Sequence, residues 1–200
     1  MLFATGVVNH RPPMDSGLHD AALNAGALRY CPVCDGFEVT DKRVGVIGTG
    51  DRGVKVARFL RSFTADLTLI APDGAHDLSE ADRAEMTAAG VTMIDGPARN
   101  FAPSDGGLTL DTAAGRMAFA SVYPALGSDI RSDLVASLGA ATVGGGCIVV
   151  DDHQRTSVAG LYAAGDVVLG LDQISHAMGE GGVAATTLRN DLAEKRPLHR

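Results

Sequence analysis

A glycine-rich loop directly after a short apolar segment constrains this chain more than any other feature. Residues 43–47 are typical of a buried parallel strand, and Gly48, Gly50 and Gly53 follow at the spacing G-x-G-x-x-G before a helical pattern begins. Gly48 permits a tight turn, Gly50 lets a pyrophosphate approach the backbone, and Gly53 allows close helix–strand packing. The pattern predicts a dinucleotide-binding loop, with a purely structural turn as the alternative. The predicted nucleotide contacts in this loop are Gly48, Thr49, Gly50, Asp51 and Gly53.

Strands and helices continue to alternate after this loop. Apolar segments at 67–70 and 91–94 predict two further strands, and residues 80–89, capped by Ser79, predict the helix between them. This order is one half of a doubly wound parallel sheet. Beyond these elements apolar and polar residues alternate with a period of two, which predicts an antiparallel meander over residues 98–101, 108–112 and 116–120. The sequence therefore predicts an α/β fold with a Rossmann-like domain.

The chain beyond residue 120 has a mixed pattern. The tail, residues 194–200, is expected to fray. The predicted elements are strands at 121–125, 147–150 and 160–166 and helices at 132–138 and 173–192.

The residue at the end of the second strand determines the choice of pyridine nucleotide. A carboxylate there accepts a hydrogen bond from a ribose 2′-hydroxyl, whereas basic groups hold a 2′-phosphate. Asp73 lies near the expected position, and no Arg or Lys occurs between Ile70 and Arg83. We therefore expect NADH to be favoured over NADPH. Asp73 also follows Pro72 and precedes a glycine, so a simple turn residue is the alternative interpretation.

Two of the three cysteines form the pair Cys31-Pro-Val-Cys34, and Asp35 follows directly. Two thiols one helical turn apart can form a disulfide, and an adjacent carboxylate can carry the proton that dithiol–disulfide exchange requires. No second Cys or His pair follows at zinc-ligand spacing, so redox chemistry is favoured and no metal site is predicted. The third cysteine, Cys147, is expected to be a small buried residue.

Charge and hydropathy exclude several classes of partner. The net charge is −7, which gives no electrostatic attraction for a nucleic-acid backbone or an anionic membrane surface. The apolar segments have the length of strands rather than of membrane-spanning helices, and nothing resembles a secretory signal. We expect a cytoplasmic protein that binds neither nucleic acid nor membrane.

Three motifs stand in register over essentially the whole chain: residues 31–37 around the cysteine pair, residues 44–50, and Gly160–Asp166 followed by Gln173. Together they resemble the low-molecular-weight thioredoxin reductase family. The resemblance implies a Rossmann-like FAD/NAD(P)-binding architecture in three parts. Residues 27–120 would form the pyridine-nucleotide domain with the cysteine pair, residues 1–26 a remnant of an FAD domain, and residues 121–200 the C-terminal part of that second Rossmann-like domain.

The resemblance also implies roles for individual residues. Cys34 would face the flavin, Cys31 would attack the substrate, and Asp35 would act as the acid/base. The implied FAD contacts are Thr5 and Gly6 at a strand end, Gly165 and Asp166, whose carboxylate would hold the ribityl and phosphate region, and Gln173 and Ile174 at the start of a helix that would face the isoalloxazine.

The chain departs from the family pattern in several places. A first G-x-G-x-x-G unit for the ADP half of FAD is absent, so the chain resembles a fragment or a shortened gene product. Ala71-Pro-Asp73 replaces the basic pattern after the second nucleotide strand, and Asp172 precedes Gln173. His176 is expected to be a helix-surface residue bonded to a neighbour, with a role as an extra proton carrier as the alternative.

We expect a flavin-dependent disulfide oxidoreductase that passes a hydride from NAD(P)H through FAD to Cys31–Cys34 and on to a disulfide substrate. That substrate would be a thioredoxin-like protein or a small molecule. One alternative is a dithiol oxidase that uses oxygen and no nicotinamide, and another is an inactive nucleotide-binding module, completed by a separate FAD-binding chain. We expect a homodimer, or a chain completed by a missing FAD-binding segment.

Overall fold

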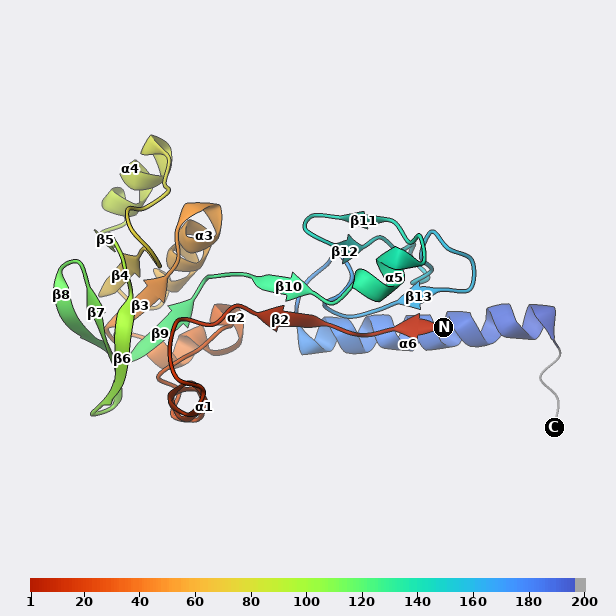
Figure 1. Cartoon of the computed structure of the whole chain (residues 1–200), viewed down its shortest axis with the longest axis horizontal. Coiled ribbons are helices and arrows are strands. Elements are labelled where there is room, and N and C mark those ends of the chain that lie inside the picture. The colour runs from red at the N-terminus through yellow and green to blue at the C-terminus, as the bar shows by residue number, and fades with distance from the viewer. Residues whose placement is uncertain (197–200) are drawn as a thin grey trace. The chain divides into compact units, whose positions relative to one another are not determined.

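The computed structural model describes residues 1–196, and the chain forms two compact units (Figure 1). Unit 2 is continuous and spans His10–Gly127, whereas unit 1 combines Met1–Asn9 with the chain from Ser128 onward. The functional boundaries expected at residues 26 and 120 concern which cofactor each part binds, and they remain predictions. Of the tail expected to fray, residues 197–200 lie outside the described residues. Across residues 1–196, no helix has the length and apolar character needed to cross a bilayer.

A four-stranded parallel sheet forms the centre of unit 2, in the order β5-β4-β3-β9. All residues of β3, β4 and β9 are buried, which explains why these strands are mostly apolar, because a parallel sheet is covered on both faces. The strands are β3 (Val44–Ile47), β4 (Leu67–Ile70), β5 (Thr92–Ile94) and β9 (Ser121–Pro124).

Different layers cover the two faces of this sheet. Because side chains alternate along a strand, Val46 and Leu69 pack with α3 and α4, whereas Ile47 and Ile70 pack with the meander of β6, β7 and β8. The covering elements are α3 (Gly50–Leu60), α4 (Glu80–Ala88), β6 (Arg99–Ser104), β7 (Gly107–Thr112) and β8 (Gly115–Phe119).

The predicted α/β order is confirmed in this unit. Ser79 caps α4 as expected, since its hydroxyl accepts from the Asp82 amide at 3.1 Å. The sequence did not predict α1 (Ser16–Asn24), because only His19 and Ala22 of that helix are buried and the apolar period is weak. The short helices α2 (Pro32–Asp35) and η1 (Gly36–Val39) complete the unit.

Unit 1 consists of short strand pairs, a short helix and one long helix. Its core contains Phe3, Val135, Ile148 and Val167. The strands expected at 147–150 and 160–166 are shorter, because each pairs with a partner of only two residues. The pairs are β1 (Leu2–Phe3) with β13 (Tyr162–Ala163), β2 (Val7–Asn9) with β10 (Ser128–Ile130) and β11 (Thr142–Val143) with β12 (Cys147–Ile148), and the helices are α5 (Asp133–Ser137) and α6 (Ile174–Lys195).

Candidate functional site

The predicted cysteine pair is a disulfide at the start of α2. Cys31 is the N-terminal cap of this helix, and its sulfur accepts from the Cys34 amide at 3.1 Å. The Cα atoms lie 5.3 Å apart, within the usual range for a disulfide. Cys147 is a free thiol and is partly exposed, so the expectation that it is buried is wrong. The glycines on its N-terminal side form an open turn that covers it only in part.

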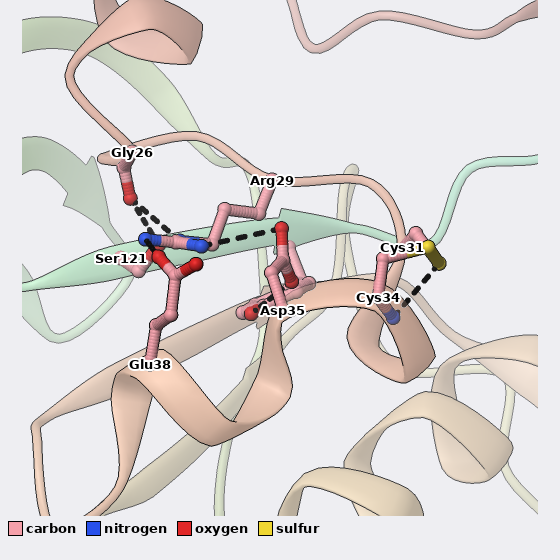
Figure 2. A network of polar contacts seen from close by, with 8 residues as sticks. Gly26, Arg29, Cys31, Cys34, Asp35, Glu38 and Ser121 are labelled. Atoms are coloured by element: carbon pink, nitrogen blue, oxygen red, sulfur yellow. Dashed lines mark hydrogen bonds and ion pairs between the residues drawn. A yellow bond between two sulfur atoms is a disulfide. The ribbon is translucent and has the colours of Figure 1, made fainter.

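The carboxylate of Asp35, the residue after Cys34, is held by two donors. One oxygen accepts the Tyr123 hydroxyl at 2.7 Å, and the other lies 3.3 Å from an Arg29 guanidinium nitrogen. Figure 2 shows the Asp35 side chain pointing towards Arg29, with the sulfur atoms to its right. Burial, reinforced by the hydrogen bond to Asp35, raises the pKa of the Tyr123 hydroxyl, so Tyr123 remains a proton donor to this carboxylate.

Arg29 is itself fixed by further partners (Figure 2). It donates to Glu38 at 2.7 Å and, through Nε, to the Gly26 carbonyl at 2.9 Å. Ser121 at the start of β9 donates to that same carbonyl at 2.7 Å. The side chain of Arg29 is 14% exposed, so this cation is largely withdrawn from water and compensated by two carboxylates. The network ties the segment before the disulfide to the central sheet.

The glycine-rich loop has the geometry expected of a nucleotide cradle. A Cβ on Gly53 would lie 2.8 Å from the Gly48 carbonyl carbon, so α3 packs against the end of β3 as closely as glycines allow. Gly50 adopts φ +58°. At Gly50 a Cβ would contact only one backbone oxygen, at 3.6 Å, so the backbone there is open to a ligand. This opening at the N-terminus of an 11-residue helix fits a pyrophosphate.

Two loop residues predicted to contact the nucleotide, Thr49 and Asp51, also bond to other residues of the protein. The Thr49 hydroxyl accepts from the Asp77 amide at 2.7 Å, and the buried His76 ring lies 3.4 Å from the same oxygen. Asp51 pairs with Lys55 one turn along α3 at 2.7 Å. The bonds to the Thr49 hydroxyl fix the segment after β4 against the glycine loop.

A cavity of about 560 Å³ opens at the carboxyl ends of the parallel strands of unit 2. Ile47 and Leu126, at or just beyond the ends of β3 and β9, form part of its wall, and Asp73 lies on its lining; its predicted contact with a nucleotide stays a prediction. Two cations, Arg11 and Arg99, also line it. Ligands of open α/β sheets bind at this edge.

The structure brings together the residues of unit 1 expected to contact FAD. Because β1 and β13 are parallel, Thr5 and Gly6 follow one strand at the edge where Gly165 and Asp166 follow the other. Gln173 caps α6, whose first two turns contact this edge: a Cβ on Gly165 would lie 3.5 Å from Ala177. Gly165 adopts φ +78°, a conformation that favours glycine. Two glycines, whose backbone a ligand can approach closely, and the carboxylate of Asp166 thus gather where the flavin end of FAD is expected, and the residues fit that group.

A largely buried acid at this edge was not predicted. Glu180 of α6 accepts the Gly165 amide at 2.7 Å, and its side chain is only 10% exposed. His176 bonds Glu180 at 3.0 Å, which confirms the expected helix-surface histidine with a neighbouring partner. Burial, and then the charge of Asp166, raise the pKa of the Asp172 carboxyl. Among residues 1–196, no three His, Cys, Asp or Glu side chains are arranged to hold a metal ion.

The sequence missed several side chains because their partners are distant in the chain. No local pattern links Tyr123 to Asp35 or Arg99 to Asp73. The signal available for Tyr123 was a tyrosine inside a strand expected to be buried, since a buried hydroxyl needs a hydrogen-bond partner. The missed residues are Arg11, Arg29, Arg99, Tyr123 and Glu180.

A glycine loop at the end of a parallel strand and a disulfide in the same unit are features of the class of dinucleotide-binding redox proteins. The sequence profile of the pyridine nucleotide-disulphide oxidoreductase family matches residues 1–181. The chain therefore belongs to the pyridine nucleotide-disulphide oxidoreductase family. This confirms both the predicted fold class and the resemblance to thioredoxin reductases.

Individual relatives and solved structures are consistent with this family membership. The chain is 31% identical over 190 residues to a thioredoxin reductase of Mycolicibacterium smegmatis, covering 88% of this chain and 60% of the relative. It is 32% identical over 183 residues to an alkyl hydroperoxide reductase protein of Xanthomonas campestris pv. phaseoli, covering 86% of this chain and 34% of the relative. The thioredoxin reductase structure from Streptococcus pyogenes superimposes with a TM-score of 0.83 at 25% identity, covering 96% of this chain and 65% of that one. The chain thus spans between a third and two thirds of these proteins.

Proposed function

We propose that the chain is a flavin-dependent disulfide oxidoreductase of the thioredoxin reductase type. Electrons would pass from NAD(P)H through FAD to Cys31–Cys34 and on to a disulfide substrate. The observation that supports this most strongly is the presence of a disulfide and a glycine-rich nucleotide cradle in the same unit. Unit 2 would bind the pyridine nucleotide, and unit 1 would contribute to the FAD site.

The nucleotide would bind along the carboxyl edge of the unit 2 sheet. Its pyrophosphate would contact the amides at the N-terminus of α3, and Asp73 would accept from the adenosine ribose, which favours NADH. The family membership and the cavity at this edge support the assignment. The residues proposed for nucleotide binding are Gly48, Thr49, Gly50, Asp51, Gly53 and Asp73.

The flavin would bind at the edge of unit 1 where β1 and β13 end. FAD accepts a hydride and returns its electrons as a pair, which links nicotinamide to thiol chemistry. Backbone groups of Gly6 and Gly165 can approach it closely, and the Asp166 carboxylate can accept from its hydroxyls. The residues proposed for this site are Thr5, Gly6, Gly165, Asp166, Gln173 and Ile174.

The chemical step at the cysteines balances without a metal. One NADH and one proton reduce Cys31–Cys34 to two thiols, and these reduce a substrate disulfide to two thiols while the protein disulfide re-forms. Cys31 would attack one sulfur of the substrate disulfide and release the first substrate thiol, leaving a mixed disulfide. Cys34 would then attack the Cys31 sulfur, re-form the protein disulfide and release the second thiol, and Asp35 would hold or release the proton. Arg29 and Tyr123 support this role, because they keep the Asp35 carboxylate oriented.

The proposed substrate is a thioredoxin-like protein or a small disulfide. Val33, between the two cysteines, and Phe37, three residues after Cys34, are 61% and 80% exposed, so the segment that carries the disulfide presents apolar side chains to a partner. A second copy of the chain, or a separate FAD-binding segment, is the proposed assembly partner.

The test begins with FAD added to the purified chain and removed again by gel filtration. Flavin absorbance that persists and bleaches anaerobically with NADH supports the proposal, as does NADH-dependent reduction of a chromogenic aromatic disulfide. The Cys34→Ser variant should lose disulfide turnover and keep nucleotide binding, and Cys147→Ser is the matched control. Bleaching by dithiothreitol but not by NADH would favour the dithiol oxidase, and a colourless chain would refute independent activity.

A further inference from the structure

Asp73 does not face the unit 2 cavity alone. Arg99, at the start of β6, and Arg11 line the same cavity, although neither belongs to the segment after β4 in which a basic residue was sought. The nitrogen Nη2 of Arg99 lies 3.9 Å from Oδ1 of Asp73. One carboxylate and two guanidinium cations therefore line the cavity in which the adenosine ribose is proposed to bind.

Backbone bonds hold Asp73 and Arg99 in this arrangement. The Gly96 amide donates to the Gly74 carbonyl at 2.6 Å, and the Ala98 amide donates to the Pro72 carbonyl at 3.1 Å. The two accepting residues, Pro72 and Gly74, lie on either side of Asp73 in the sequence. The two donating residues, Gly96 and Ala98, lie just before Arg99. The two side chains are therefore close because their main chains are joined, and not because they attract each other.

The ion pair itself is loose. At 3.9 Å, with side chains 64% and 85% exposed, Arg99 and Asp73 form a pair that contributes little to stability. Arg99 can therefore exchange Asp73 for another anion at small cost. Guanidinium groups bind phosphate through paired hydrogen bonds, whereas a lone carboxylate would repel a phosphate.

We propose that Asp73 and Arg99, assisted by Arg11, allow this cavity to accept both NADH and NADPH, with Asp73 bonding the 2′-hydroxyl of the first and the arginines bonding the 2′-phosphate of the second. This inference rests on the proposed function, because it assumes a pyridine nucleotide in the cavity. It replaces a simple preference for NADH with dual use.

Calorimetric titration of the full chain with NAD⁺ and with NADP⁺ tests the inference. Arg99→Ala should weaken NADP⁺ binding by about tenfold or more and leave NAD⁺ binding almost unchanged, because one charge-assisted contact is lost. Arg11→Ala should act in the same direction with a smaller effect. Asp73→Asn should weaken NAD⁺ several-fold and strengthen NADP⁺, since it removes both an acceptor and a negative charge. Arg99→Lys should restore part of the NADP⁺ affinity.

Arg43→Ala is the matched control, because Arg43 precedes β3 at the opposite edge of the sheet. It should leave both affinities unchanged. If NAD⁺ binds and Arg99→Ala alters neither affinity, or both equally, the dual-use inference is wrong and the proposed function stands. If the unmodified chain binds neither nucleotide, the proposed nucleotide site fails and this inference fails with it.

Discussion

The hydroxyl of Tyr123, on β9 at the end of the parallel sheet, donates a 2.7 Å hydrogen bond to the carboxylate of Asp35 beside the disulfide, 88 residues away in sequence. Tyr123 is 1% exposed, so its hydroxyl depends on this carboxylate to replace the hydrogen bonds that it would make to water. This buried contact therefore adds to the bonds by which β9 supports the cysteine segment.

Tyr123→Phe should lower the free energy of unfolding by about 1–2 kcal/mol, because a hydrogen bond to a charged group is lost without creating a cavity. Urea unfolding of the oxidised chain measures this. Asp35→Asn and the double variant complete a thermodynamic cycle. Additive effects of the two substitutions would show that the contact contributes nothing.

Arg29→Met should destabilise the chain by about 1–3 kcal/mol, because Asp35 and Glu38 then lack their shared cation and the Gly26 carbonyl loses a donor. Arg58→Met is the control, since Arg58 makes a comparable but exposed pair with Glu85, and an exposed pair contributes much less to stability. Thermal melting monitored by circular dichroism compares the two variants. Equal losses would contradict the importance of burial at Arg29.

Gly53→Ala should cost about 1–3 kcal/mol and weaken dinucleotide binding, because the new Cβ would lie 2.8 Å from backbone and force α3 away from β3. The control is Gly179→Ala in α6, where a Cβ meets nothing within 4 Å and should be neutral or stabilising. Melting temperatures and nucleotide titrations of both variants are the measurements. A Gly53→Ala chain that binds as well as the original would refute the tight-packing argument.

Acid should destabilise unit 1 through Asp191. Hydrogen bonds from Arg155 at 2.7 and 2.8 Å, and one from Tyr162, lower the pKa of this carboxyl below the usual aspartate value of 3.8. Since the folded pKa is lower, the stabilisation is fully present above pH 3.8 and is lost as the pH falls through the folded value.

Asp191→Asn should therefore lower the melting temperature at neutral pH, and the difference from the unmodified chain should shrink as the pH falls below 3.8. Asp152→Asn, an exposed acid of the same unit, should show no such trend. If the difference in melting temperature grew as the pH fell, the proposed loss of the Asp191 stabilisation in acid would be wrong.

Local patterns predicted the central sheet well, because β3 and β4 are apolar runs bounded by turns and need no distant information. The glycine loop and cysteine pair were equally local. In contrast, α1 buries only two residues and left no periodic signal. The pairs Tyr123–Asp35 and Arg99–Asp73 depend on how distant segments fold together, so the sequence alone located one member of each pair and missed the other.

Unit 2 is inserted into a hairpin of unit 1. Asn9 and Ser128 are directly opposed where β2 pairs with β10, and just beyond them the His10 amide donates to the Gly127 carbonyl at 2.7 Å. The chain therefore leaves unit 1 and returns to it at one point. A two-residue turn joining Asn9 to Ser128 would close unit 1 as an ordinary β-hairpin. Excision, transplantation and circular permutation of the disulfide-bearing unit thus become practical manipulations at a single junction.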